Sequence, residues 1–193
     1  MKTGDSVFDH YAPEYDAWFD THKATYAAQL ALISQVIPAG CRALETGVGS
    51  GRFAAPLGIR HGLDPSPALL AMARQRGVET VLGIGECLPY RAGTFDYVLM
   101  MTVICYLEDY ARSFREADRV LKPGGTLVIG FLEKGREIAT RELAKEPKGR
   151  FLRHAKFRSL PDVTGALDDA GFSHTVTCNR GFCIVIAKKE RAL

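Results

Sequence analysis

The chain has 193 residues, enough to bury one hydrophobic core and too few for two comfortable ones. Hydrophobic residues make up 47% and charged residues 24%, as in ordinary globular proteins, and a net charge of +3 does not argue for a nucleic acid or an anionic membrane. No run of about 18 apolar residues exists, and the first residues include acids where a signal peptide needs an apolar segment, so we expect no membrane span and a cytoplasmic location.

The first 36 residues predict two helices, over 5–19 and 22–36, with a break near Asp20 and Thr21. Pro38-Ala39-Gly40 ends the second helix. Segments of strand length then alternate with helical patterns, which predicts β-α-β units and a parallel sheet. These segments are strand 43–45, helix 52–57, strand 59–63, helix 67–76, strand 78–82, strand 95–101, helix 109–121 and strand 126–131.

The C-terminal third begins with a charged and weakly helical span, and we interpret 133–158 as an insertion that caps the carboxyl edge of the sheet. A last helix over 160–170 ends at Gly171. The stretch FSHTVTCNRGFCIVIAKK then predicts two strands joined by an Asn-Arg-Gly turn, in which Asn and Gly supply the left-handed conformations. A hairpin cannot belong to a purely parallel sheet, so at least one of these strands runs antiparallel.

The number of cysteines is odd, and no pair has C-x-x-C spacing. Cysteines in or beside apolar runs are typical of small buried side chains, so we expect neither a zinc site nor a disulfide scaffold. Three thiols gathered around a soft acceptor such as arsenite remain an alternative. The five are Cys41, Cys87, Cys105, Cys178 and Cys183.

The segment ALETGVGSGRF places Gly47, Gly49 and Gly51 at alternate positions behind a short apolar run and the acid Glu45. A glycine-rich turn after a strand lets the backbone approach a nucleotide closely. A pyrophosphate here would be repelled by Glu45, at roughly 3 kcal/mol for each like-charge pair about 6 Å apart. The spacing also differs from the dinucleotide pattern G-x-G-x-x-G. S-adenosylmethionine has no phosphate and carries a cationic end, so Glu45 would favour it, directly or through a water.

Asp64 is the second candidate ligand of a nucleoside, because it ends the second strand of the pattern, 17 residues after Gly47. A carboxylate at this point can accept hydrogen bonds from both ribose hydroxyls. The same residue would also suit NAD, or would serve simply as an acid at the start of a helix. Ser66 is expected to cap that helix, with Pro67 in its first turn.

These motifs resemble the class I, Rossmann-like S-adenosylmethionine-dependent methyltransferases, most of all the small single-domain branch related to quinone-biosynthesis C-methyltransferases. The resemblance implies an α/β three-layer sandwich in which residues 1–193 form one domain around a seven-stranded, mostly parallel sheet with an antiparallel C-terminal hairpin. It also implies S-adenosyl-L-methionine as cofactor and S-adenosyl-L-homocysteine as product. The segments that carry it are LETGVGSGRF, GLDPSP, GIGECLPYRAGTFDYVLM, RVLKPGGTLVI, DDAGF and FDHYAPEYDAWF.

The resemblance also implies roles for single residues, with 1–36 folding over the cofactor. Ile84 stands where the family carries Asp or Thr, so adenine would be read by backbone groups near Gly85, Glu86 and Cys87. Glu86 matches the family's acid but could equally cap a helix. The implied cofactor-binding residues are Tyr11, Tyr15, Glu45, Gly47, Gly49, Gly51, Asp64, Ile84, Gly85, Glu86 and Met101.

Methyl transfer is an in-line displacement that needs alignment of the reacting atoms and exclusion of water, and it needs a general base only if the acceptor loses a proton. We find no metal-binding spacing and no catalytic triad; His154 and Tyr15 are the candidate bases. The acceptor is expected beyond the carboxyl ends of the fourth and fifth strands. The residues expected there are Met101, Thr102, Ile104, Tyr106, Phe131 and Glu133.

The function predicted is methyl transfer to an unidentified small molecule. A non-catalytic sensor or partner subunit that binds S-adenosylmethionine is the alternative, and an RNA methyltransferase or an NAD-dependent oxidoreductase is less favoured. The segment 148–158, KGRFLRHAKFR, holds five Lys or Arg with two Phe between them. It is either a solvated basic face or a contact for an anionic acceptor or RNA; overall we do not expect a nucleic acid partner.

Overall fold

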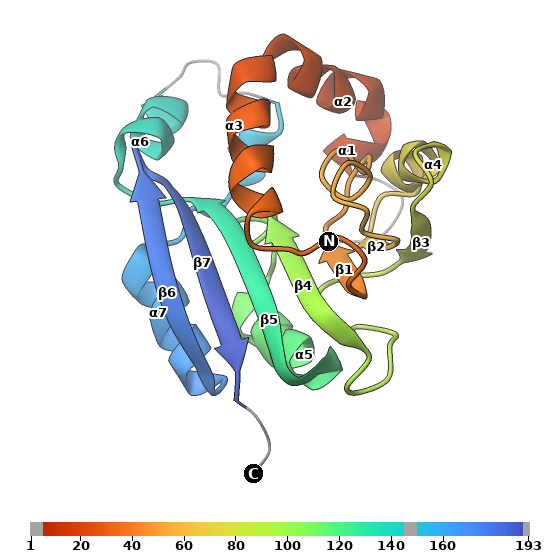
Figure 1. The fold of residues 1–193 in the computed structure, drawn as a ribbon. Coiled ribbons are helices and arrows are strands. Elements are labelled where there is room, and N and C mark those ends of the chain that lie inside the picture. The colour runs from red at the N-terminus through yellow and green to blue at the C-terminus, as the bar shows by residue number, and fades with distance from the viewer. Residues whose placement is uncertain (1–5, 145–149, 191–193) are drawn as a thin grey trace.

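The computed structural model describes residues 6–144 and 150–190 and builds them around one seven-stranded sheet (Figure 1). The strands are β1 (Ala43–Thr46), β2 (His61–Asp64), β3 (Glu79–Leu82), β4 (Phe95–Met101), β5 (Leu121–Leu132), β6 (Phe172–Asn179) and β7 (Phe182–Lys189). The helices are α1 (Val7–His10), α2 (Ala12–Thr21), α3 (Lys23–Ser34), α4 (Pro67–Gln75), α5 (Tyr110–Val120), α6 (Glu137–Ala144) and α7 (Leu160–Asp169), with the short turn η1 (Leu152–His154).

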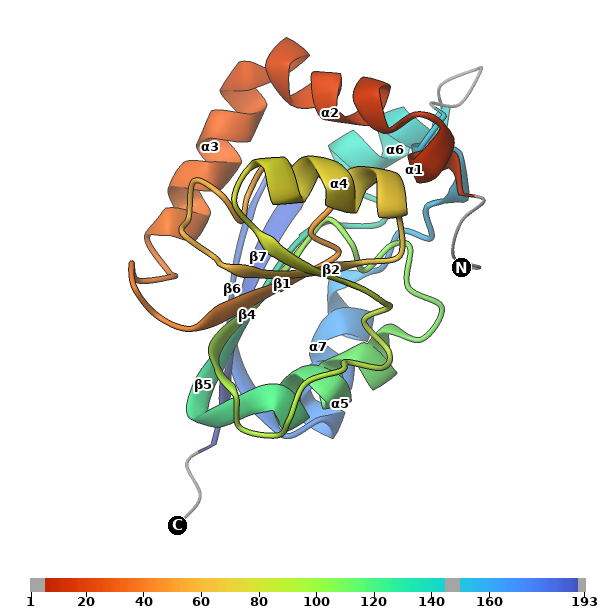
Figure 2. The same cartoon turned by 90° about the vertical axis from the view of Figure 1, so that its right-hand side faces the viewer.

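The strand order is β3-β2-β1-β4-β5-β7-β6, and β7 runs antiparallel to both of its neighbours. This confirms the predicted mixed sheet with its antiparallel C-terminal hairpin. In Figure 2 the helices α1 to α4 lie on one side of the sheet and α5 and α7 on the other. The described residues therefore form the three layers of the predicted sandwich.

Two buried clusters fill the spaces between the layers, and β4 contributes to both because successive strand residues face opposite ways. Val98 and Met100 pack toward α5 and α7, where Phe114 is fully buried. Leu99 and Met101 pack toward α3 and α4 on the other face. None of the helices described here has the length and apolar composition needed to cross a bilayer.

The helix that carries the cofactor motif forms as its sequence predicts. The Ser66 hydroxyl accepts from the backbone N–H of Leu69 at 3.2 Å, and Pro67 occupies the first position of α4. The helix ends at Gln75, with Arg76 as its C-cap, and Gly77 follows with a φ of 85°. Because α4 begins directly after β2, its N-terminus lies at the carboxyl edge of the sheet.

The helix predicted over 52–57 is instead a run of turns. Pro56 has no N–H to donate to the carbonyl of Arg52, and that carbonyl accepts the hydroxyl of Tyr26 from α3 instead. Gly58, with a φ of 69°, then closes the segment before β2. The break expected near Asp20 and Thr21 lies at His22, and a second break at Tyr11, which was not predicted, divides the first leading helix into α1 and α2.

The C-terminal hairpin corrects two further predictions. Its turn is formed by Arg180 and Gly181, with φ angles of 49° and 90°, because Asn179 is still paired as the last residue of β6. Cys178 and Cys183 face each other across the hairpin and are joined by a disulfide, which the odd number and spacing of cysteines did not lead us to expect. Of the other three cysteines Cys87 is exposed, and Cys41 and Cys105 are half-buried rather than core residues.

Candidate functional site

A cleft of about 720 Å³, measured with the solvent at its mouth, opens at the carboxyl ends of β1, β2 and β4. It brings together most of the predicted cofactor-binding residues. The lining residues are Phe8, Tyr15, Thr46, Gly47, Gly49, Leu63, Asp64, Pro65, Leu69, Ile84, Gly85, Glu86, Met101, Thr102, Val103, Tyr106 and Leu107. A smaller pocket of about 230 Å³ shares Tyr15, Gly47, Met101 and Thr102 with this cleft and reaches Glu45.

The glycine loop after β1 is held against β2, since the N–H groups of Gly47 and Val48 donate to the Leu63 carbonyl at 2.7 and 3.0 Å. Gly47 has a φ of 71°, and a Cβ there would collide with the side chain of Val103. Gly51 is required for a different reason, because a Cβ there would come within 3.1 Å of the α4 backbone at Ala73. Gly47 therefore keeps the cleft open, whereas Gly51 lets α4 pack closely.

Asp64 links the glycine loop to the start of α4. One carboxylate oxygen accepts from the Gly49 N–H at 2.9 Å, and the other accepts from the Ser66 N–H at 2.9 Å. Burial raises the pKa of Asp64 to about 6, against the effect of these two bonds and with help from the charge of Asp9. Each carboxylate oxygen can accept a second bond, so both keep acceptor capacity at the cleft.

Glu45 is the most unusual group of the site. Its side chain is 2% exposed, and its Oε2 atom has no hydrogen-bond partner. Burial and, less strongly, the charge of Asp64 raise its pKa well above the usual range, although a bond from the Ala54 N–H opposes the shift. A buried, unpartnered carboxylate oxygen is costly, and it marks a position where a positively charged donor would be stabilised.

Four aromatic rings from separate segments contact one another at the cleft, and three of them, Phe8, Tyr15 and Tyr106, line it. Phe8 contacts Tyr15, Tyr106 and Phe151, with ring centroids 5.5, 5.1 and 5.4 Å apart. Phe151 also meets Tyr15 edge-on at 5.5 Å. We call Phe8, Tyr15, Tyr106 and Phe151 the aromatic roof. Burial raises the pKa of both tyrosines, so their hydroxyls stay protonated and neutral at physiological pH.

Buried Asp16 fastens α2, which carries Tyr15, to the glycine loop. Its carboxylate accepts from the Ser50 hydroxyl at 2.6 Å and from the guanidinium groups of Arg52 and Arg76 at 2.7 and 2.8 Å. Burial opposes ionisation, but these bonds outweigh it and hold the pKa of Asp16 at about 2. The sequence predicted that the leading helices fold over the cofactor site, but it did not predict the contacts of Asp16 with Ser50 and the two arginines. The signal that could have indicated them is Arg52, which follows Gly51 directly.

The predicted adenine loop also lines the cleft, but its acid is already occupied. Glu86 Oε1 accepts from the N–H groups of Glu108 and Asp109 at 2.9 and 3.4 Å, just before α5, whereas the cap of that helix is Asp109, which accepts from the Arg112 N–H. Ile84 is 37% exposed and offers an apolar side chain at the edge of the cleft.

At the carboxyl end of β4, Thr102 has a φ of 52°, a strained conformation for a β-branched residue. It lines the cleft with Met101 and Tyr106, as expected of an acceptor site. Three other residues expected there lie elsewhere, because Ile104 and Phe131 belong to the core beneath α5 and α7, and Glu133 is buried beside Cys183. Phe8 and Phe151 were not predicted to contribute.

Tyr11 and His154, like Gly51, line neither pocket. The guanidinium of Arg150 stacks on the ring of Tyr11 in a cation–π contact, 3.6 Å from the ring centroid. His154 is exposed, and its Nε2 accepts from Arg153 at 2.9 Å. The described cations of the basic segment have partners of their own, including Glu108 for Lys156, while Lys148 and Gly149 lie outside the described residues.

Comparison with known proteins supplies names for similar chains. Residues 44–129 match a family described as a methyltransferase domain. The chain is 37% identical over 169 residues to an uncharacterized protein of Methanocaldococcus jannaschii. The aligned region covers 88% of this chain and 82% of that protein. It is 31% identical over 141 residues to demethylmenaquinone methyltransferase of Bacillus mycoides, covering 63% of this chain and only 59% of that enzyme.

Among solved structures, a crystal structure from Thermotoga maritima superposes with a TM-score of 0.88 at 30% identity. It covers 95% of this chain and 99% of that one, and it is described as an S-adenosylmethionine-dependent methyltransferase, possibly a histamine N-methyltransferase.

Proposed function

The chain belongs to the S-adenosylmethionine-dependent methyltransferases, and from that premise we propose that it transfers the methyl group to a small acceptor held beneath the aromatic roof. S-adenosylmethionine is therefore the cofactor, and when bound it supplies a methyl group already activated by the sulfonium. The chain itself has to bind the two reactants, align them and exclude water. The buried, unpartnered Oε2 of Glu45 is the observation that carries the proposal.

The cleft's donors and acceptors fit this cofactor from end to end. We assign the ammonium of the methionine part to Glu45 and the ribose hydroxyls to Asp64, which keeps free acceptor capacity. Gly47 and Gly49 allow close approach of the backbone between them. We assign adenine to the apolar surface of Ile84, with Gly85 supplying backbone groups.

The composition of the cleft also limits the acceptor. Its lining within the described part of the chain contains no Lys, Arg or His, and Tyr15 and Tyr106 are held neutral by burial. A negatively charged acceptor would thus find no cation. The acids in the lining are Asp64, which we assign to the ribose, and Glu86, whose Oε1 already accepts from two backbone N–H groups, so we assign neither to the acceptor as a base. We expect a neutral or cationic acceptor with a flat apolar part. Its nucleophilic atom should already carry a free lone pair when the acceptor enters the cleft. This proposal gives His154 no role.

A thermal-shift panel tests the cofactor assignment. A ligand at 100 times its Kd adds about 2.7 kcal/mol to the free energy of unfolding. For a domain of this size that corresponds to roughly 5–11 °C. We expect such a shift with S-adenosylhomocysteine and none with NAD; a shift with NAD alone would overturn the assignment and favour an oxidoreductase.

Incubation with cofactor labelled in its methyl group tests the transfer. Pools of aromatic and heteroaromatic amines form one arm, carboxylic acids a second and total RNA a third. Label in an amine product supports the proposal, and label in acids or RNA would contradict the acceptor class. A thermal shift without a labelled product from any pool would favour the non-catalytic sensor.

A further inference from the structure

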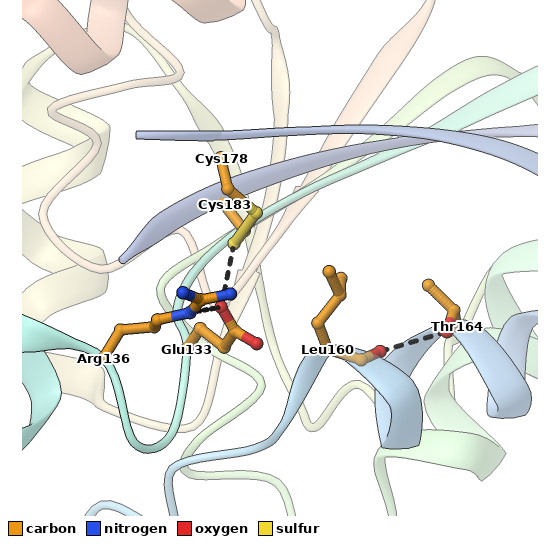
Figure 3. The surroundings of a disulfide bond; sticks show 6 residues. All are labelled: Glu133, Arg136, Leu160, Thr164, Cys178 and Cys183. Carbon is orange, nitrogen blue, oxygen red and sulfur yellow. Dashed lines mark hydrogen bonds and ion pairs between the residues drawn. A yellow bond between two sulfur atoms is a disulfide. The ribbon is translucent and has the colours of Figure 1, made fainter. Parts of the chain in front are cut away.

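The turn between β6 and β7 gathers two disulfide-bonded cysteines and one carboxylate that the methyl-transfer site does not use (Figure 3). Cys178 and Cys183 are opposed in the hairpin, with Cα atoms 4.1 Å apart. Glu133 follows β5 directly, is 8% exposed, and places its Oε2 3.8 Å from the sulfur of Cys183. The two sulfurs and a carboxylate oxygen all lie within 4.8 Å of one another.

Strand pairing fixes the backbone positions of these three residues. Leu132 is paired with Phe182, and the N–H of Glu133 donates to the Gly181 carbonyl at 2.8 Å. The acid is therefore tied to the same turn that carries the two cysteines. None of the three lines the cleft, and the described partner of the Glu133 carboxylate, besides the sulfur, is the guanidinium of Arg136.

Reduction changes what this cluster can bind. A dithiol reductant donates two electrons and two protons to the disulfide, which breaks the S–S bond and leaves two thiols. Two thiolates and a carboxylate are the donor set of a Zn²⁺ site that keeps a fourth position for water. We propose that the reduced protein binds a thiophilic divalent cation of the Zn²⁺ class through Cys178, Cys183 and Glu133, releasing the two thiol protons to solvent.

The geometry allows this without moving the strands. With Zn–S bonds of about 2.3 Å, tetrahedral coordination needs sulfurs roughly 3.8 Å apart. Rotation about the side-chain bonds of two facing cysteines supplies that separation. Cys178 is exposed and leaves an entry path for the ion.

One neighbouring cation has to give way. Arg136 Nε donates to Glu133 Oε2 at 2.9 Å, and its side chain is 66% exposed, so the guanidinium can turn into solvent. The metal would join the same two strands that the disulfide joins. The turn would then be closed in a reducing as well as in an oxidising environment.

The test uses the full chain, reduced with a phosphine and freed of the reductant without oxygen. Zn²⁺ is titrated in competition with a chromogenic chelator, and Co²⁺ is used in parallel because its thiolate charge-transfer bands report sulfur ligation. We expect one equivalent of tightly bound metal, a higher Tm of the reduced protein with metal, and loss of alkylation at Cys178 and Cys183. The oxidised protein should bind none.

Three variants make the result specific. Cys178→Ser changes an exposed side chain, so it should fold, and it should weaken Zn²⁺ binding by at least roughly 10–100-fold. Glu133→Gln should weaken binding similarly and leave the Co²⁺–thiolate bands in place. Cys87→Ser, at an exposed cysteine elsewhere, is the matched control and should bind as the parent does. No stoichiometric metal in the reduced parent, or equal affinity in Cys178→Ser, would overturn the proposal, and an unchanged affinity in Glu133→Gln would remove Glu133 from it.

Discussion

Glu45→Gln separates binding from stability in the cofactor site. The substitution keeps the size of the side chain and the acceptor for the Ala54 N–H, and it removes the charge. Because burial raises the pKa of Glu45, its carboxyl stabilises the empty protein in acid, and that stability is lost as the pH rises through the folded pKa. At neutral pH the empty variant should therefore be the more stable of the two proteins.

The expected sizes follow from what the carboxylate lacks. Removing the buried charge should raise the free energy of unfolding of the empty protein by about 1 kcal/mol, or 2–4 °C in Tm, even though the amide nitrogen of Gln takes the place of the unpartnered oxygen. The lost charge-assisted bond to the cofactor's ammonium should weaken S-adenosylhomocysteine binding by about 1.5–3 kcal/mol, or roughly 10–150-fold. Thermal unfolding of the empty protein and calorimetric titration measure the two effects separately.

Glu79→Gln is the matched control, because Glu79 lies on the edge strand β3 with its side chain 71% exposed. It should change neither quantity appreciably. A Glu45→Gln protein that is less stable when empty and binds S-adenosylhomocysteine with the parent's affinity would refute the reasoning, since the buried charge would then have a structural partner and no ligand.

Three other predictions concern single groups around the glycine loop. Asp64→Ala should weaken S-adenosylhomocysteine binding by about 2–4 kcal/mol. In the parent protein, the affinity for S-adenosylhomocysteine should fall as the pH drops through about 6, where Asp64 takes up a proton. An affinity that does not change between pH 5 and pH 8 would contradict this role. Asp16→Asn should lower the free energy of unfolding by roughly 3 kcal/mol, as thermal unfolding can measure. Asp20→Asn should have little effect, because the Asp20 carboxylate is exposed. Equal losses of stability in the two variants would show that burial of the carboxylate does not determine its contribution. Cys105, whose pKa burial raises to about 12, should resist alkylation at neutral pH under conditions that label exposed Cys87, as peptide mass spectrometry can show; equal labelling would exclude that environment.

Local sequence signals predicted the parts of the structure that depend on neighbouring residues. The cap at Ser66, the stop before Gly77 and the β4 strand over 95–101 follow from side chains within a few positions of each element. Asp64 was predicted for the same reason, because the end of a parallel strand meets the start of the next helix at a fixed edge of the sheet. Its neighbours Gly49 and Ser66 then complete a site that the motif alone implies.

The features that the sequence did not predict depend on contacts between distant segments. The aromatic roof joins Phe8 to Phe151, more than a hundred positions apart, and no spacing rule connects them. The disulfide depended on the register of β6 against β7, because a shift of one residue would place Cys178 and Cys183 on opposite faces. The helix expected over 52–57 failed because Pro56 interrupts it while Tyr26, from α3, takes up the freed carbonyl.

Three buried acids surround the glycine loop, and their partners distinguish their roles. Asp16 has cationic partners, its pKa is held at about 2, and it stabilises the fold over the whole physiological range. Glu45 and Asp64 accept only from backbone N–H groups, and each lies near another acid, Asp64 for Glu45 and Asp9 for Asp64. Burial therefore raises both pKa values, and the empty protein loses stability as they ionise. A fold under no other constraint would not keep two such groups 19 positions apart in sequence at one cleft. The ligand that we propose, which donates to both and is positively charged near Glu45, would give them the partners that the protein itself does not provide.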